Sequence, residues 1–521
     1  MVISLSRVLH VSCGIIIFFL FILKNNIIIP KVVYFIFFIA LIPVGQFFGG
    51  VIYNLGDALL VSMYIGFFLI VFICGYNVSR LNSEVKTKIL TCFLLPFLIS
   101  SIISVGLQLS QWLLLEGDIW VADLRENARP YANVAQPNLL STLLIIGVLS
   151  IFYFYENKFL GKFSAGLSMA FIIFGIALTF SRTAWIFCVF FIIFYFLKKR
   201  CIKDKFNLSN LSFVSWVILF FTYLFFIPII SEKLGLLYRG DIYTRVSTGG
   251  ERINIWVQLL EIIYNQPILG YGWNQLNIAQ MSVEGIDLKY PIFGYSHNFI
   301  LDILIWNGLF LGSILILTIF YFFVKLVLVV RFKNDLILLS MVGIIVLHSL
   351  LEYPFAYAYF LIPLSFLVSI IYGNYFFSQI KIKKPKIIVS IISVILVSLL
   401  FLTAYEYIRI NPEFQSMRYE KAKLKSQELH QDKEEYLMVK SINDYIWFVR
   451  YPLKSNIPLD DLERAKNLAF SKPSRPVLMH YMKILILNNR LDEVEFVLNK
   501  YNSFYNAQLS LHDIESLVVK N

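Results

Sequence analysis

The chain has 521 residues, of which 58% are hydrophobic and 15% are charged, and its formal net charge is +12. A mean hydropathy of +0.73 means more apolar surface than one soluble core can bury, which excludes an ordinary soluble globular protein. Because much of the basic excess stands in short loops beside apolar runs, the charge describes membrane topology. We therefore expect the lipid bilayer, and no nucleic acid, among the partners.

Apolar runs of roughly 15 to 20 residues, each near the length that crosses a bilayer as a helix, recur as far as residue 405. They predict an all-α fold, namely a polytopic membrane helix bundle of about 12 spans. In chain order, the predicted spans are residues 9–23, 32–48, 57–75, 89–105, 139–154, 165–180, 184–197, 213–230, 299–330, 336–351, 355–372 and 387–405. The span at 299–330 is long enough to include an interfacial segment ahead of Gly308.

Basic residues orient this bundle. Five short loops carry them: Arg80, Lys86 and Lys88; Lys158 and Lys162; Lys198, Lys199, Arg200, Lys203 and Lys205; Arg331 and Lys333; Lys381, Lys383, Lys384 and Lys386. Loops rich in Lys and Arg stay in the cytoplasm. Alternation then places residues 108–138, 181–183, 352–354 and a large loop at 231–298 together on the opposite, periplasmic face, with the C-terminal residues 406–521.

The composition changes at Glu406, after which Lys, Glu, Asp and Asn return at the frequency of soluble proteins. We therefore divide the chain into a transmembrane domain at 1–405 and a C-terminal soluble domain at 406–521. Apolar residues at helical spacing, such as Leu462, Ala465 and Leu468, predict that this second domain is helical.

Motifs of nucleotide and metal chemistry are absent from the sequence. It contains no G-x-x-x-x-G-K-[ST], and Gly270 and Gly272 are followed by Gln275 where a dinucleotide loop would have its third glycine. It contains no D-x-D pair, and its five cysteines have no paired spacing. We expect no cofactor and no metal site, so a diphosphate substrate would have to be bound by arginines.

Six arginines stand close to the predicted outer membrane surface: Arg125, Arg129, Arg182, Arg239, Arg245 and Arg252. Guanidinium groups bind diphosphate oxygens bidentately and keep their charge. Arg182 directly precedes a span, at the level of lipid headgroups, where a plain interfacial anchor is an equally good interpretation. Arg252 opens an amphipathic helix with Trp256 one turn later, and solvated surface charge is the alternative there.

His297 is the histidine with a dense polar and aromatic setting, in the sequence Tyr-Ser-His-Asn at 295–298. It closes the large outer loop just before a span, where an imidazole could accept a proton from a hydroxyl near neutral pH. A lone histidine is more often structural, but its position on the outer face with the arginines favours a catalytic role.

Two further outer-face segments put polar side chains at the edge of a span beside a proline, Tyr-Ala-Asn-Val-Ala-Gln-Pro-Asn at 131–138 and Leu-Glu-Tyr-Pro at 351–354. Asn133, Gln136 and Asn138 can donate hydrogen bonds to sugar hydroxyls, and Tyr353 can bind a phosphate or an acceptor. Helix capping and turn formation are the alternatives, and capping is favoured for Asn138.

At these residues the sequence resembles the O-antigen ligase and polymerase superfamily, and most closely its PglL-type protein O-oligosaccharyltransferase branch. The shared motifs, in order, are A-Q-P-N at 135–138, T-F-S-R-T-A at 179–184, G-G-E-R-x-x-x-W at 249–256, P-I-L-G-Y-G-W at 267–273, S-H-N at 296–298 and L-E-Y-P at 351–354. Ala132 departs from the glycine that family members usually have before the asparagine of the first segment.

The resemblance implies an enzyme that transfers glycan from undecaprenyl diphosphate at the periplasmic face of the bacterial inner membrane, without nucleotide or essential metal. It implies His297 as the catalytic residue, Arg182 and Arg252 as the diphosphate-binding residues, and Gln136 and Tyr353 as positioning residues. We add Asn133 and Asn298 to the group that positions donor or acceptor.

The preferred acceptor is a serine or threonine of an exported protein such as a pilin, because the branch resemblance points there. An O-antigen ligase acting on lipid A core, or a polymerase acting on a second lipid-linked glycan, shares the same donor chemistry and stays open. A lipid-linked glycan transporter is the alternative from another class. The spans are poor in charged residues, which argues against an ion-coupled transporter.

Overall fold

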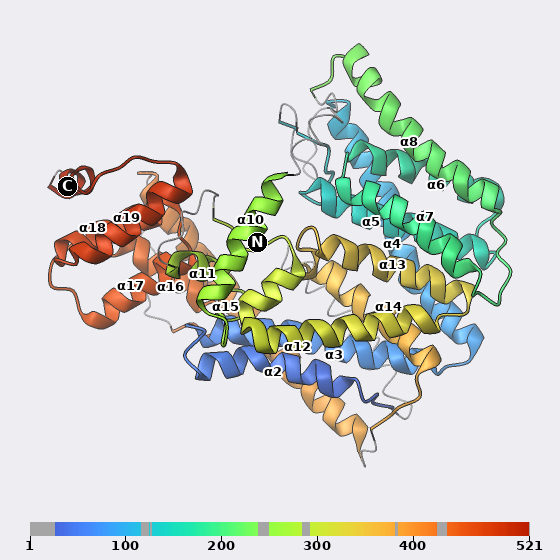
Figure 1. The fold of residues 1–521 in the computed structure, drawn as a ribbon, viewed down its shortest axis with the longest axis horizontal. Helices are drawn as coiled ribbons and strands as arrows, with labels where there is room; N and C mark the ends of the chain where they lie inside the picture. Colours follow the sequence, from blue (N-terminus) through green and yellow to red (C-terminus); the bar gives the residue numbers. More distant parts are fainter. Residues whose placement is uncertain are drawn as a thin grey trace.

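The computed structural model describes residues 27–115, 124–125, 128–237, 250–283, 292–380, 384–424 and 435–519, with the side chains of 250–253 left aside. Within these ranges the chain forms 18 α-helices and one short 3-10 helix at Pro354–Ala356 (Figure 1). The one strand-like pairing in the same ranges is an isolated bridge between Pro30 and Gln379. The all-α prediction is confirmed.

Eleven of the twelve predicted spans form helices, and the first, at 9–23, lies outside the described residues. These helices are α2 (Val33–Phe48), α3 (Leu55–Ser79), α4 (Ser83–Trp112), α5 (Pro137–Glu156), α6 (Lys162–Leu178), α7 (Arg182–Lys199), α8 (Asn210–Lys233), α12 (Phe299–Val329), α13 (Lys333–Ser349), α14 (Ala358–Tyr375) and α15 (Pro385–Lys421). Seven of them, α3, α4, α5, α8, α12, α14 and α15, are long and apolar enough to cross a membrane. The protein is a multi-pass membrane protein.

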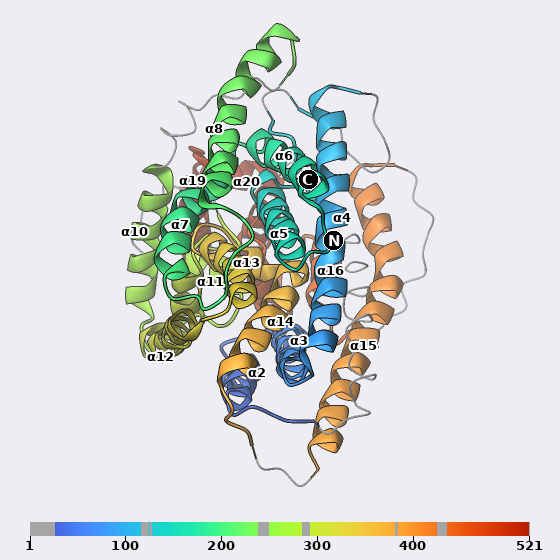
Figure 2. The same ribbon diagram turned by 90° about the vertical axis from the view of Figure 1, so that its right-hand side faces the viewer.

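The spans divide into central and peripheral helices. The buried share of the apolar stretch is 78% in α5 and 72% in α14. It is only 17% in α12 and 28% in α15. Figure 2 shows α3, α5, α13 and α14 in the middle of the bundle, with α4, α8, α12 and α15 around them. Apolar side chains that point away from the protein need lipid as solvent, so the peripheral helices face the bilayer.

Three of the five predicted basic loops meet at one end of the bundle. Lys333 Nζ lies 3.0 Å from Glu156 Oε2, and the same carboxylate accepts from the backbone N–H groups of Asn207 and Leu208. These contacts join the α5–α6, α7–α8 and α12–α13 connections. The prediction that these three loops share a face is confirmed, and the residues of the outer segments gather at the other end.

A break in α12 separates its first turns from its long second half. Gly308 has φ +73° and ψ 175°, which is not helical. A Cβ atom on Gly308 would lie 2.3 Å from the carbonyl oxygen of Ile268, and one on Gly270 would lie 2.4 Å from the Gly308 nitrogen. The two glycines let the backbone before α11 pass directly over the break, where the sequence predicted an interfacial segment.

The C-terminal helices share a hydrophobic core with the large outer loop. The loop contributes α10 (Gly250–Asn265) and α11 (Leu276–Ser282), and the C-terminal part contributes α16 (Lys440–Arg450), α17 (Leu459–Ser471), α18 (Arg475–Leu487), α19 (Leu491–Tyr505) and α20 (Leu511–Val519). Buried members of this core include Leu259 and Leu276 from the loop, Ile305 from the first turns of α12, and Leu468 and Leu478 from the C-terminal helices.

The predicted domain boundary falls inside a helix, because α15 continues past Tyr405 to Lys421. Just after the boundary, the Glu406 carboxylate accepts from three consecutive backbone N–H groups, those of Leu437, Met438 and Val439. These hydrogen bonds hold the segment that precedes α16 against α15. The division at 405 stays a prediction.

Candidate active site

A polar cavity of about 170 Å³ opens where the outer segments meet. It is lined by Arg129, Gln136, Asn138, Phe180, Arg182, His297 and Glu352. These residues are up to 223 positions apart in the chain but come together at the starts of α5, α7 and α12 and just beyond the end of α13. Three of the predicted site residues, Gln136, Arg182 and His297, therefore share one cavity.

His297 is held by a buried carboxylate. Its Nδ1 lies 2.7 Å from Glu352 Oε2, and the two side chains are 28% and 3% exposed. An ionised carboxylate can only accept, so Nδ1 carries the proton and Nε2 of the neutral ring is the acceptor. His297 also has φ +58°, a left-handed conformation that non-glycine residues adopt at some energetic cost. The pair is built like the histidine and its orienting acid in hydrolases.

Glu352 is itself fixed from two sides. Its backbone N–H donates to the carbonyl of His348 at 2.8 Å, and its Oε1 accepts from the Asn138 side-chain amide at 3.2 Å. From the sequence, Glu352 was only part of the L-E-Y-P segment and had no assigned role. The available signal was an acidic residue at the edge of an apolar span, directly before Tyr353.

The prediction that Asn138 caps a helix is wrong. The N-cap of α5 is Gln136, which makes no side-chain cap bond, and Asn138 lies two residues inside the helix. Its amide oxygen accepts from Arg129 Nη1 at 3.2 Å while its amide nitrogen donates to Glu352. Asn138 therefore joins a guanidinium to the carboxylate that holds His297.

The cavity suits an anion. Arg129 donates to Asn138 and to the carbonyl of Thr179 at 3.2 Å, which ties it to the end of α6. Arg182 is the first residue of α7 and reaches the same cavity. The N-termini of α5 and α7 add the positive ends of two helix dipoles to these two guanidinium groups. From the sequence, Arg129 was one of six outer-face arginines and had no specific role.

Tyr353 lies beside the catalytic candidate but does not line the cavity. Its ring centroid is 5.0 Å from that of His297, and it stacks on Tyr295 at 4.9 Å. Burial, with the neighbouring Tyr357 and Glu352, raises the pKa of the Tyr353 hydroxyl to about 12. Tyr353 is therefore a neutral hydrogen-bond donor at any physiological pH.

Asn298 and Asn133 also do not line the cavity. The Asn298 side chain accepts from the Ile300 backbone N–H at 3.0 Å and so caps α12. The Asn133 side chain accepts from Ser104 Oγ at 3.3 Å. The Arg252 side chain lies outside the described residues, although its backbone belongs to α10.

Ala132, which stands where family members usually have glycine, has the backbone conformation that favours glycine. It has φ +50°, in the left-handed region that glycine adopts without steric cost. Two hydrogen bonds from the backbone N–H groups of Tyr131 and Ala132 to Gln111 Oε1, at 2.9 and 2.7 Å, hold this turn in place. The backbone that favours glycine is thus kept here with an alanine.

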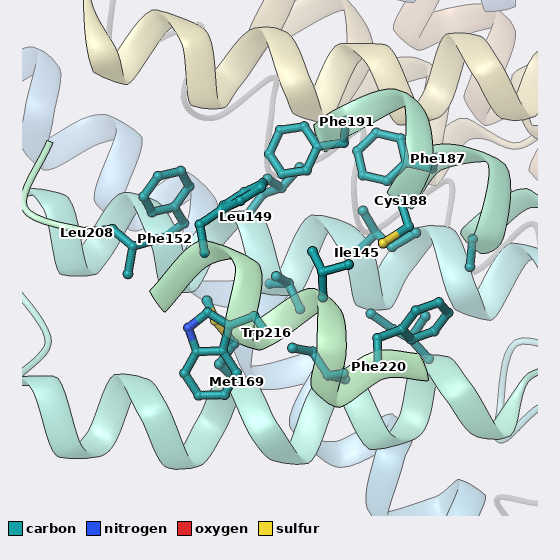
Figure 3. A pocket seen from close by; sticks show the side chains of 16 residues that line it. Ile145, Leu149, Phe152, Met169, Phe187, Cys188, Phe191, Leu208, Trp216 and Phe220 are labelled. Atoms are coloured by element: carbon teal, nitrogen blue, oxygen red, sulfur yellow. The ribbon is translucent and has the colours of Figure 1, made fainter. Parts of the chain in front are cut away.

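A second pocket, of about 110 Å³, is apolar and lies deeper among α5, α6, α7 and α8. Figure 3 shows Ile145, Phe187, Phe191, Trp216 and Phe220 around it. Its wall includes Ala184 of α7, only two residues after Arg182 of the polar cavity. An apolar pocket whose wall begins two residues from an anion site suits a ligand with a charged head and a hydrocarbon tail.

Two family models match the chain. The model described as O-Antigen ligase matches residues 167–316, and that described as Virulence factor membrane-bound polymerase, C-terminal, matches residues 336–514. The first range contains Arg182 and His297, and the second contains Glu352.

Two proteins of Acinetobacter baylyi are similar to the chain. A General O-oligosaccharyltransferase is 28% identical over 485 residues, which cover 92% of this chain and 84% of that protein. A ComP-specific O-oligosaccharyltransferase is 32% identical over 349 residues, which cover 66% of this chain and 62% of that protein. No solved structure matches.

Proposed function

Because the chain belongs to the O-antigen ligase and polymerase superfamily, we propose that it is a protein O-oligosaccharyltransferase. In this function it moves a preassembled glycan from a lipid diphosphate to a protein hydroxyl. The observation that carries the proposal is the His297–Glu352 pair, 2.7 Å apart, in one cavity with Arg129 and Arg182. That cavity puts a general base beside a diphosphate-binding site.

The donor is undecaprenyl-diphosphate-linked oligosaccharide. Arg129 and Arg182 bind the diphosphate, and the apolar pocket that begins at Ala184 receives part of the isoprenoid chain. Arg252 joins the diphosphate site from α10. Protein cations and helix N-termini supply the stabilising charge here, and the proposal requires no cofactor.

The reaction is a displacement at the anomeric carbon. The acceptor oxygen forms a bond to that carbon while the bond from the carbon to the diphosphate oxygen breaks. His297 Nε2 takes the acceptor's proton, and the Glu352 carboxylate stabilises the imidazolium that forms. The diphosphate leaves on its lipid with its negative charge held by the arginines, and Gln136 and Tyr353, with Asn133 and Asn298 nearby, position donor and acceptor.

The acceptor is a serine or threonine of an exported protein such as a pilin, and the active face is the periplasmic face of the inner membrane. The names of the two relatives support a protein acceptor. The match to the O-Antigen ligase model favours lipid A core as the second candidate acceptor, with a lipid-linked glycan for a polymerase. All three share the donor site described above.

The test is a reconstituted transfer reaction with purified protein, undecaprenyl-diphosphate oligosaccharide and a candidate pilin, followed by intact mass of the pilin. A glycan-sized increase that His297→Ala abolishes, and that the exposed His512→Ala retains, supports the proposal. Modification of lipid A core in a parallel reaction, with an unmodified pilin, would identify a ligase. Movement of the carrier without cleavage of its diphosphate would identify a transporter.

A further inference from the structure

Helix α10 has three different faces. Leu259, Ile262 and Ile263 are buried against the protein, with exposed fractions of at most 3%. Val257, Leu260 and Tyr264 form a second stripe at three- and four-residue spacing, and they are 54%, 52% and 81% exposed. The third face is polar and exposed, and it carries Asn254, Glu261 and Asn265. The exposed apolar stripe is therefore flanked by protein on one side and by a water-facing surface on the other.

This apolar stripe continues into a surface that faces lipid. After α10, the Pro267 carbonyl accepts from the Leu309 backbone N–H at 2.6 Å, which places the turn on the start of the long half of α12. Ile268 and Leu269 in that turn are 76% and 61% exposed. The adjoining α12 residues that are also exposed are Leu309, Phe310, Ile314, Leu317, Phe320 and Tyr321.

The direction of α10 differs from that of the spans. In Figure 1, α10 runs across the direction of α12 and α3 and stands at the end of the bundle near the C-terminal helices. In Figure 2 it again runs across the view, at the outer edge of the molecule next to α12. Relative to α12 and α3, α10 therefore has the orientation of a helix that lies along a membrane surface.

We propose that α10 is an interfacial helix whose stripe of Val257, Leu260 and Tyr264 rests in the outer leaflet of the bilayer. The occupant of this stripe is lipid because the stripe is continuous with the lipid-facing surface of α12, and the polar face of the same helix is free to point toward water. Tyr264, the most exposed residue of the stripe, is of a type enriched at the membrane interface.

The membrane thereby positions the loop that carries His297. Trp256 Nε1 of α10 donates to the Ser296 carbonyl at 3.1 Å, directly before His297. The Tyr271 hydroxyl donates to the Ile262 carbonyl at 3.1 Å and fixes α10 to the backbone that crosses the α12 break. The depth of α10 in the leaflet therefore sets the height of the His297 loop above the bilayer, whichever reaction takes place there.

The test places a photoreactive amino acid at single positions of the full-length protein in lipid nanodiscs and identifies adducts by mass spectrometry after illumination. Leu260 and Tyr264 are the test positions, and Glu261, one residue away on the polar face, is the matched control. An aromatic photoreactive residue replaces Tyr264 conservatively, which keeps the test valid if the Leu260 variant fails to fold.

We expect phospholipid adducts at 260 and 264 and only background at 261. Adducts to a second copy of the chain at the test positions would overturn the proposal, as would equal lipid labelling at 260 and 261. Absence of lipid adducts at 264 in a variant with the thermal midpoint of the wild type would also overturn it.

Discussion

Among single residues, Glu352 links the two halves of the proposed chemistry. One oxygen of its carboxylate holds His297 Nδ1, and the other accepts from Asn138, which in turn accepts from Arg129. The proposed proton transfer and the proposed diphosphate binding are thus connected through a single buried carboxylate. A diphosphate that pulls on Arg129 would also act on the orientation of the imidazole.

Replacing Glu352 with Gln should lower transfer about 10²-fold, because the amide keeps the shape but removes the charge that stabilises a protonated His297. The turnover rate in the reconstituted reaction measures this effect. Glu84→Gln is the matched control, since Glu84 is 76% exposed in an ion pair with Lys88 on α4. A wild-type rate for Glu352→Gln would exclude this positioning role.

Tyr353→Phe should lower transfer by the same factor at pH values of about 7 and about 9. The reason is that burial raises the pKa of Tyr353 to about 12, so the hydroxyl stays neutral across this range and acts only as a hydrogen-bond donor. Rates of the two proteins over this pH range test the prediction. A deficit that disappears as the pH rises would show that the phenol titrates there.

The sequence predicted part of this site. His297, Gln136 and Arg182 could be identified because topology placed their segments on one face and the motifs marked them. Glu352 and Arg129 received no role because their importance arises from contacts between residues 50 or more positions apart, His297 with Glu352 and Arg129 with Thr179. The prediction for Asn138 was wrong because a helix-capping residue and a cavity-lining residue can both stand at the start of a helix, and the sequence does not distinguish them.

Among the helices, the break at Gly308 is the feature that fixes the outer loop. Gly308→Ala should destabilise the protein by at least about 2 kcal/mol, because its φ of +73° with ψ of 175° is a region that essentially only glycine adopts. The added Cβ would also meet the Ile268 carbonyl. The thermal midpoint in detergent measures this.

Gly343→Ala in α13 is the matched control for this glycine, because a Cβ there meets nothing within 4 Å and Ala favours a helix. Its midpoint should be equal to that of the wild type or higher. Equal midpoints for the two variants would show that the break is not a steric requirement.

Apolar run length predicted eleven of these helices because a helix in lipid must satisfy its own backbone and present apolar side chains all round. The same signal could not distinguish the central α5 from the peripheral α12, since both are apolar. It also could not show that α15 continues to Lys421 beyond the predicted boundary, because the change in composition does not coincide with the end of the helix.

For the whole molecule, the shared core between the outer loop and the C-terminal helices predicts that the two parts are stabilised together. Leu468→Ala should cost about 2–5 kcal/mol, because Leu468 is only 4% exposed and its removal leaves a cavity in that core. Leu459→Ala in the same helix is the control, since Leu459 is 76% exposed.

Thermal midpoints and transfer to two unrelated acceptors measure the result for these variants. Leu468→Ala should lower the midpoint and reduce transfer to both acceptors alike, because the loop that carries His297 loses support. A loss confined to one acceptor would instead indicate that α17 contacts that acceptor directly.

The shared core also limits how this protein can be recombined with its relatives. Exchanging only the C-terminal helices between two homologues would pair Leu468 and Leu478 with a loop surface that evolved against other side chains. A hybrid that also takes residues 250–307 from the same donor keeps both sides of that surface matched. Attempts to change acceptor choice by grafting should therefore exchange the loop and the C-terminal helices as one cassette.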